Sequence, residues 1–103
     1  NILIVDDLID TAGTFVNAVK ALRDAGAKLI YGACTHPILS GKAYERINKS
    51  DVQSIVVTDT LPLKETTEKL EVRSAAKLFA EAILRTHSHE SISSLFDIDK
   101  DKI

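Results

Sequence analysis

The sequence is poor in the residues that would mark a disulfide-rich or membrane-spanning protein. Its 103 residues include one cysteine, two prolines, four glycines, no tryptophan and no methionine. The single cysteine, Cys34, excludes an intrachain disulfide and a cysteine-based zinc site, and its apolar neighbours predict a buried small residue. No apolar run approaches the roughly 20 residues of a membrane span and no signal-peptide pattern is present, so we expect a cytoplasmic protein with no membrane partner.

A large excess of either charge is also absent. The formal net charge is -2, with 27% charged and 45% hydrophobic residues, which is ordinary for a globular chain of at most one domain. This balance gives no sign of a nucleic-acid partner, although a phosphate site needs no net positive charge because backbone N–H groups can form it. The lack of methionine, together with an apolar run directly after Asn1, leads us to expect a piece of a longer protein.

The stretch ILIVDDLIDTAGT, residues 2–14, organises the rest of the chain. Residues 2–5 are all apolar and predict a strand buried on both faces. Asp6, Asp7 and Asp10 follow at the carboxyl end of this strand, and the small residues 11–14 lead into a helical pattern. The first N–H groups of a helix have no partner within it and attract anions, and ligands of open α/β sheets bind at the carboxyl ends of strands. This stretch is therefore the candidate functional site.

The acidic residues need their own explanation, because a carboxylate repels a phosphate. The conflict disappears if Asp6, Asp7 and Asp10 face sugar hydroxyls or a bound cation instead. The alternative is that they are solvated loop acids, each stabilising the helix N-terminus by ~0.3–1 kcal/mol. Thr11 and Thr14 are equally consistent with simple helix caps. Gly13 is consistent either with an unusual backbone angle or with a close approach to a ligand.

The remaining chain alternates between strand and helix patterns. We expect helices at residues 14–25, 41–48 and 74–86, and strands at residues 28–34, 52–57 and, most weakly, 71–73. Gly26 is expected to end the first helix. Thr35, His36 and Pro37 are expected to end the second strand, and Ser40 is expected to cap the second helix. The alternation predicts an α/β fold with a parallel sheet of about four strands and right-handed crossovers.

The last third of the chain has one clear amphipathic pattern. Leu78, Phe79, Ala82 and Ile83 share one face of the expected helix, and residues 97–103 resemble a frayed, charged tail.

Other reactive side chains give weaker signals. The three histidines, His36, His87 and His89, are not spaced like metal ligands, and a pairing of Cys34 with His36 as nucleophile and base has no support from a cleft. Asp59 and Thr60 are consistent with a second site at a strand end or with a turn, and we favour the turn. We therefore assign no metal ligand and no catalytic residue.

The motif VDDLIDTAGT, residues 5–14, resembles the ribose-phosphate-binding motif of the type I phosphoribosyltransferase fold. Three further stretches are similar to the C-terminal portion of the ribose-phosphate pyrophosphokinases: THPILSG (residues 35–41), VVTDTLP (residues 56–62) and AEAILRTHSHESISSLF (residues 80–96). The resemblance covers nearly the whole chain. It implies that residues 1–103 are part of a C-terminal phosphoribosyltransferase-like domain.

The resemblance also implies an activity and a site. Enzymes of this family transfer diphosphate from ATP to ribose 5-phosphate, with Mg²⁺, giving phosphoribosyl diphosphate and AMP. Asp6 and Asp7 would hold the ribose hydroxyls. The 5-phosphate loop would consist of Asp10, Thr11, Ala12, Gly13 and Thr14, with Ala12 standing where many members carry glycine.

Other parts of the family's machinery have no counterpart here. The ATP-binding segments, the metal ligands and the catalytic flexible loop of the family all precede this motif, so we expect this chain to be inactive alone. The resemblance further implies dimers assembled into hexamers.

The C-terminal stretch contains a second candidate site. Ser91, Ser93 and Phe96 match a segment that, in regulated members, helps form an allosteric phosphate or nucleotide site at a subunit contact. The alternative is an ordinary capping turn with Leu95 and Phe96 as core anchors.

Three other functions remain open. A base-transferring phosphoribosyltransferase would share the loop, but residues 80–96 argue against it. A non-catalytic, synthetase-associated regulatory subunit would tend to lose the intact loop. A phosphatase of the D-x-D-x-T kind would need a second acid two residues after Asp7, but Asp7 is followed by Leu8 and then Ile9.

Overall fold

The computed structural model describes residues 1–96, without the side chains of Ser94 and Phe96. The expected charged tail, residues 97–103, lies outside the described residues. The elements follow one another as β1 (Ile2–Ile9), α1 (Gly13–Asp24), β2 (Ile30–Pro37), α2 (Ala43–Lys49), β3 (Ser54–Thr58), β4 (Leu70–Arg73), α3 (Ala76–His87) and a short 3-10 helix η1 (Ser93–Phe96). Among the described helices, none is both long and apolar enough to cross a membrane.

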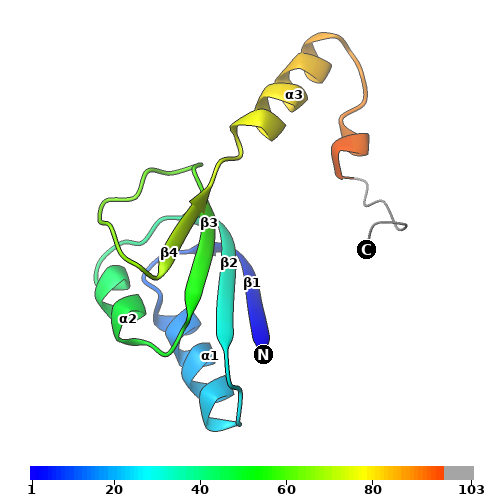
Figure 1. Ribbon diagram of the computed structural model, residues 1–103. Coiled ribbons are helices and arrows are strands. Elements are labelled where there is room, and N and C mark those ends of the chain that lie inside the picture. The colour runs from blue at the N-terminus through cyan, green and yellow to red at the C-terminus, as the bar shows by residue number, and fades with distance from the viewer. Residues whose placement is uncertain (97–103) are drawn as a thin grey trace.

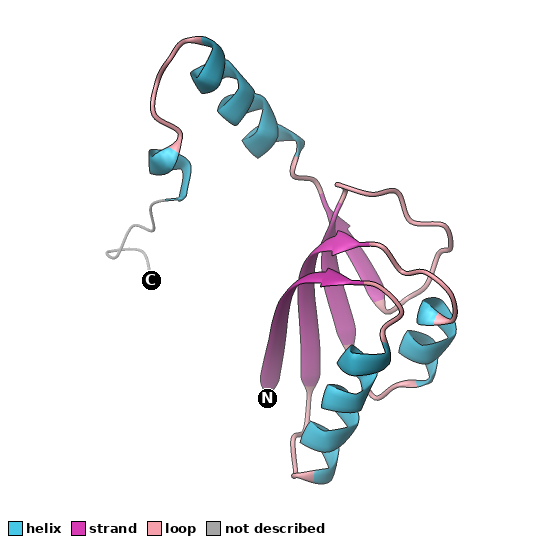
Figure 2. Cartoon of the chain, turned by 180° about the vertical axis from the view of Figure 1, so that it is seen from behind, coloured by secondary structure: helices cyan, strands magenta, loops and turns pink. Residues whose placement is uncertain are grey.

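The four strands form one parallel sheet whose order follows the chain, β1-β2-β3-β4 (Figure 1). Parallel neighbours need a crossover connection. Helices α1 and α2 supply the first two crossovers and lie on the same side of the sheet (Figure 2). This architecture confirms the predicted α/β class and parallel sheet, including the weakly predicted fourth strand.

The core lies between the sheet and these two helices. Ile30 and Ile55 from the strands are fully buried, as are Val19 of α1 and Ile47 of α2. Phe15 of α1 packs so closely on β2 that a Cβ atom added to Gly32 would lie 2.7 Å from its Cζ atom. Gly32 is thus the residue that lets α1 approach the sheet, because any side chain there would collide with the ring.

Helix α1 ends as the sequence predicts. Gly26 has a φ of 103°, its N–H donates to the carbonyl of Arg23 at 3.1 Å, and the N–H of Ala27 donates to the carbonyl of Leu22 at 3.0 Å. This pair of bonds is the Schellman arrangement, which satisfies carbonyl groups that the end of a helix leaves free.

The prediction that β1 is buried on both faces is wrong within this chain. The side chains of Leu3 and Val5 are 61% and 72% exposed, while Ile4 packs against the core. Strand residues alternate between faces, and α1 and α2 cover only one of the two. The predicted length of β1 is also wrong, because the strand continues through Asp6 and Asp7 to Ile9 instead of ending at residue 5.

Strand β2 begins and ends two to three residues later than the predicted strand at residues 28–34. Thr35, His36 and Pro37 continue the strand that they were expected to end, because β1 extends far enough to pair Ile9 with Pro37. The expected cap of the second helix is also wrong. Ser40 lies before the N-cap position of α2, which is held by Lys42 and has no side-chain cap.

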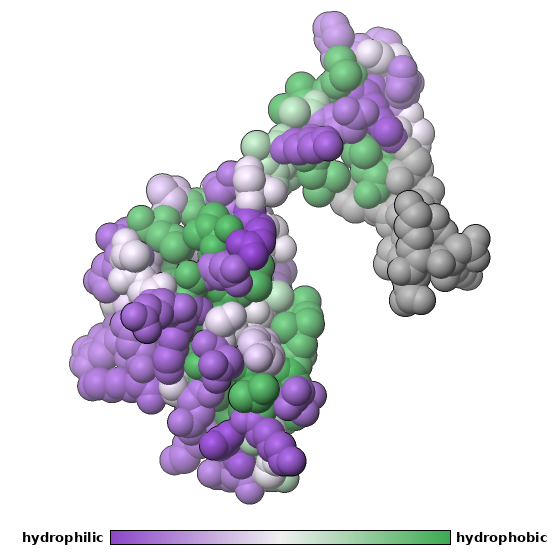
Figure 3. Space-filling model, in the orientation of Figure 1, coloured by the Kyte–Doolittle hydropathy of each residue, from purple (hydrophilic) through white to green (hydrophobic). Residues whose placement is uncertain are grey.

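Helix α3 and η1 extend away from the sheet (Figure 1). The predicted apolar face of α3 exists, but the helix buries none of its residues: Leu78, Phe79 and Ile83 are 43%, 48% and 70% exposed. Hydrophobic residues accordingly reach the surface both on the four-stranded part and along α3 (Figure 3).

Candidate functional site

A pocket of about 260 Å³ lies where β1 ends and α1 begins. Nine residues from this short stretch line it: Asp6, Leu8, Ile9, Asp10, Thr11, Ala12, Gly13, Thr14 and Phe15. The pocket is at the carboxyl end of a parallel strand, which is where ligands of open α/β sheets bind. One segment of chain therefore forms the whole lining, and it is the segment that the sequence singled out.

The backbone of this segment turns sharply at Ala12. This residue has a φ of 66°, in the left-handed region, and it is the N-cap of α1. The unusual angle that the sequence allowed for Gly13 thus lies on Ala12, whereas Gly13 begins the helix with an ordinary negative φ. Ala12 is buried and belongs to the hydrophobic core, although it also lines the pocket.

The N–H groups of this turn remain available to a ligand. No side chain caps α1, so the capping role considered for Thr11 and Thr14 is not realised. Within the described part of the chain, the N–H groups of residues 11–15 have no hydrogen-bond partner, and the first helical bond runs from the N–H of Val16 to the carbonyl of Ala12 at 3.0 Å. Consecutive unpaired N–H groups at a helix N-terminus make a site for an anion.

The three acids are placed differently from one another. Asp6 and Asp10 line the pocket and all three acids are exposed. Asp7 does not line it, as expected for the neighbour of Asp6 on a strand whose side chains alternate between faces. The carboxylate of Asp6 accepts a hydrogen bond from the N–H of Asp7 and that of Asp7 from the N–H of Leu8, each at 2.8 Å.

The segment after β2 holds Asp10 in place. The N–H of Ser40 donates to the carbonyl of Asp10 at 2.9 Å, and the hydroxyl of Ser40 donates to its carboxylate. One residue earlier, the N–H of Leu39 donates to the carbonyl of Ile9 at 3.0 Å. Sequence reasoning missed these ties, because they join residues about 30 positions apart and Ser40 reads equally well as a helix cap.

Helix α2 supplies a second contact that the sequence did not reveal. Nη1 of Arg46 donates to the carbonyl of Thr11 at 2.9 Å and lies 3.7 Å from the position that a Cβ atom on Gly13 would take. Arg46 occurs within an ordinary amphipathic helix pattern, so nothing in its spacing marks it as a neighbour of the loop.

Cys34 and His36 do not form a reactive pair. Burial raises the pKa of the Cys34 thiol to about 11, so the thiol is protonated and unreactive at neutral pH. Nδ1 of His36 is instead hydrogen-bonded to Oγ1 of Thr60, at 2.9 Å. Over residues 1–96, no three His, Cys, Asp or Glu side chains gather closely enough to hold a metal ion.

The remaining candidates lie away from the pocket. Asp59 accepts hydrogen bonds from the N–H of Ala75 and the hydroxyl of Ser74, at 2.8 and 2.7 Å, so it joins the exit of β3 to the start of α3. The hydroxyls of Ser91 and Ser93 are 2.8 Å apart in a turn beyond α3, remote from the sheet (Figure 1). The side chain of Phe96 is outside the described part.

Comparisons with known proteins identify the family and support the fold. Residues 1–97 match the phosphoribosyl synthetase-associated domain. The ribose-phosphate pyrophosphokinase of Campylobacter jejuni subsp. jejuni is 52% identical over 95 residues, covering 92% of this chain and 31% of that protein. The ribose-phosphate pyrophosphokinase of Caldanaerobacter subterraneus subsp. tengcongensis is 55% identical over 96 residues, covering 91% of this chain and 30% of that protein.

A solved structure is similar as well. The crystal structure of phosphoribosylpyrophosphate synthetase from Mycobacterium smegmatis superimposes with a TM-score of 0.81 at 38% sequence identity, covering 84% of this chain and 30% of that one. The chain thus spans about 30% of the length of the relatives that it matches. Because the domain match extends over almost all of its residues, the chain belongs to the phosphoribosyl synthetase-associated domain family.

Proposed function

We propose that this chain is the ribose 5-phosphate-binding part of a ribose-phosphate diphosphokinase. The complete enzyme would transfer diphosphate from ATP to the anomeric hydroxyl of ribose 5-phosphate, giving phosphoribosyl diphosphate and AMP. One observation carries this proposal: a pocket with five consecutive unpaired N–H groups also contains the carboxylates of Asp6 and Asp10. A sugar phosphate has both matching parts, since its phosphate accepts hydrogen bonds from N–H groups and its hydroxyls donate to carboxylates.

The residues of the pocket would divide this work by position. Residues 11–14, at the N-terminus of α1, would surround the 5-phosphate. Asp6, with Asp7 beside it in the chain, would accept hydrogen bonds from the ribose hydroxyls. Asp10 would begin the 5-phosphate loop, and its carboxylate, which accepts a hydrogen bond from the hydroxyl of Ser40, would accept a further one from a sugar hydroxyl.

The Mg²⁺ that such a reaction uses would be held mainly by other parts. Mg²⁺ is usually bound by one or two carboxylates together with substrate phosphates. We therefore place this ion mainly with the phosphates of ATP and, as the family resemblance implies, with ligands outside residues 1–103. The cytoplasmic location and the assembly of dimers into hexamers also remain predictions.

The decisive test uses the full-length protein that contains this chain. With ribose 5-phosphate, ATP and Mg²⁺, it should release AMP. Asp10→Asn keeps an oxygen for Ser40 but removes the charge, so it should raise the KM for ribose 5-phosphate by about 10- to 100-fold, corresponding to a charged hydrogen bond of ~1.5–3 kcal/mol. Gly13→Val should have a similar effect, because its Cβ atom would lie 3.7 Å from Nη1 of Arg46 and 3.9 Å from Oγ1 of Thr11, so its two further methyl groups would crowd and displace the loop.

Asp51→Asn is the matched control, because this exposed acid lies between α2 and β3 and away from the pocket. Absence of AMP from a correctly folded full-length protein would overturn the proposed reaction. Release of AMP with an unchanged KM in Gly13→Val would overturn the assignment of the loop alone.

A further inference from the structure

Arg46 is the one cation that hydrogen-bonds to the phosphate loop among the described residues. Its Nη1 atom donates to the carbonyl of Thr11, which is 35 positions away in the sequence. Its neighbour Lys49, one turn on along α2, is paired with Glu45 at 2.8 Å. In the described structure, the Arg46 guanidinium donates this hydrogen bond to Thr11 and takes part in no ion pair.

The bond reaches the loop at its most strained point. The Thr11 carbonyl belongs to the peptide unit that leads into Ala12, whose φ of 66° is costly for a residue with a side chain, by ~1–2 kcal/mol. Such a conformation persists only where neighbouring groups fix it. Ser40 fixes the residue before Thr11, through the carbonyl and carboxylate of Asp10, and Arg46 fixes the next peptide unit.

The two residues that share this peptide unit, Thr11 and Ala12, both line the pocket. Its carbonyl oxygen is on Thr11 and its N–H is on Ala12, one of the unpaired N–H groups of the pocket. A cation that binds the oxygen of a peptide polarises the unit and makes its N–H a stronger donor. Arg46 does not line the pocket itself, so it would act on a phosphate through this peptide and not by direct contact.

We propose that Arg46 is a positioning residue for phosphate binding, which fixes and polarises the Thr11–Ala12 peptide from the side opposite the ligand. The positive charge also offsets part of the repulsion between a phosphate and the two carboxylates in the pocket. This inference rests on the proposed function, since it assigns Arg46 a role in holding the 5-phosphate.

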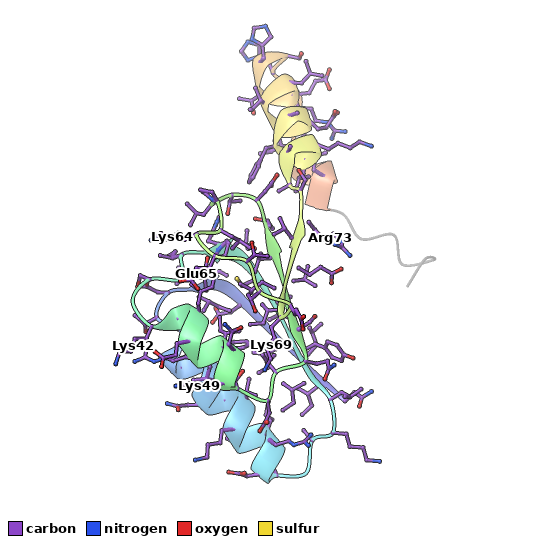
Figure 4. The ribbon with its side chains drawn as sticks, turned by 60° about the vertical axis from the view of Figure 1, so that its left-hand side comes forward. Lys42, Lys49, Lys64, Glu65, Lys69 and Arg73 are labelled. Atoms are coloured by element: carbon purple, nitrogen blue, oxygen red, sulfur yellow. The ribbon has the colours of Figure 1, made fainter. Side chains whose placement is uncertain are left out.

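The test compares three variants of the full-length protein. Arg46→Gln removes the cation, Arg46→Lys keeps it with a different donor geometry, and Lys42→Gln is the control. Lys42 is the exposed N-cap residue of α2, at the opposite end of that helix from Lys49 (Figure 4), and in the described structure its ammonium has no hydrogen bond to the loop. The readouts are the Kd of ribose 5-phosphate and of ribose by calorimetry, kcat at saturating substrate, and Tm.

Arg46→Gln should weaken ribose 5-phosphate binding by about threefold to tenfold, less than the loss of a direct hydrogen bond to the phosphate, because Arg46 acts through the Thr11–Ala12 peptide and through its charge. Ribose, which lacks the phosphate, should bind equally to both proteins, and kcat should change little. Tm should fall only slightly, because the two hydrogen bonds from Ser40 to Asp10 still hold the loop when the bond from Arg46 is lost. Arg46→Lys should recover part of the affinity, because the charge returns. A merely structural role would lower Tm and weaken both ligands together.

The two proposals fail in different ways. Unchanged affinity in Arg46→Gln, while Asp10→Asn raises the KM, would overturn the role of Arg46 and leave the proposed function standing. Equal weakening for ribose and ribose 5-phosphate would also overturn it. A wild-type protein that binds no ribose 5-phosphate would overturn both.

Discussion

Helices α1 and α3 are alike in length and amphipathic pattern but different in what surrounds them. Each has 12 residues and an apolar face of the usual helical spacing. Helix α1 packs against the sheet and buries Phe15 and Val19, whereas α3 buries no residue and leaves Ile83 70% exposed. The comparison teaches that a periodic pattern predicts a helix and the face that it offers, but the partner of that face depends on which other elements are present.

The largest expected difference lies between two isoleucines, one from each region. Ile55→Ala removes a fully buried side chain from the sheet and should lower the free energy of unfolding by ~2–5 kcal/mol. Ile83→Ala in α3 should change it by less than about 0.5 kcal/mol, because that side chain is already in water. Urea denaturation followed by circular dichroism measures both. A large cost for Ile83→Ala would show that α3 is covered in solution and would break the comparison.

A second substitution tests how closely α1 approaches the sheet. Gly32→Ala places a methyl group 2.7 Å from Cζ of Phe15 and 3.2 Å from Cγ1 of Ile55, so it should cost ~1–3 kcal/mol through overpacking. The double variant Gly32→Ala, Phe15→Leu should recover part of that loss by removing the ring. Independent, additive effects of the two changes in denaturation experiments would contradict this contact.

A third comparison is between the cost of an alanine-to-glycine substitution at the start of α1 and the cost of the same substitution in its interior. Ala21→Gly, at an exposed helical position, should cost ~1 kcal/mol. Ala12→Gly should cost about nothing, because relief of the left-handed strain of ~1–2 kcal/mol offsets both the greater freedom of glycine in the unfolded chain and the loss of a buried methyl group worth ~0.8 kcal/mol. The measurement is again chemical denaturation. Equal costs at the two positions would mean that residue 12 is not strained.

The smallest effect concerns the start of α3. The N–H of Ala75, and then the hydroxyl of Ser74, lower the pKa of Asp59 from its usual 3.8. A carboxyl whose pKa is lower in the folded state stabilises that state above its unfolded pKa, and the contribution is lost as the pH falls through the folded value. Hydrogen exchange at the Ala75 amide should therefore speed up in acid relative to unstructured amides, and Asp59→Asn should remove this dependence.

Much of the fold follows from local sequence patterns, so that part of the fold could be predicted from the sequence. Alternating strand and helix signals predicted the parallel sheet, and Gly26 predicted the end of α1, because both depend on neighbours in the sequence. The pocket-forming segment was predictable for the same reason, since its lining comes from one continuous stretch. Its role in binding ribose 5-phosphate stays a prediction.

What sequence reasoning missed depends on distant contacts. Asp6 and Asp7 are poor strand residues, so a strand ending at residue 5 was the natural expectation, yet pairing with β2 extends β1 to Ile9. The supports from Ser40 and Arg46 join the loop to residues that only the fold brings near it. The exposure of Leu3 and Val5 has a different origin, because an apolar run alone does not show whether helices cover one face of a strand or both.

The strand order has a consequence for how the site is made. Because the strands lie side by side in the order in which they are translated, every contact described around the loop is contained in residues 6–46. These residues emerge from the ribosome before β3, β4 and α3. All the parts of the candidate site and its supports are therefore synthesised before the second half of the chain.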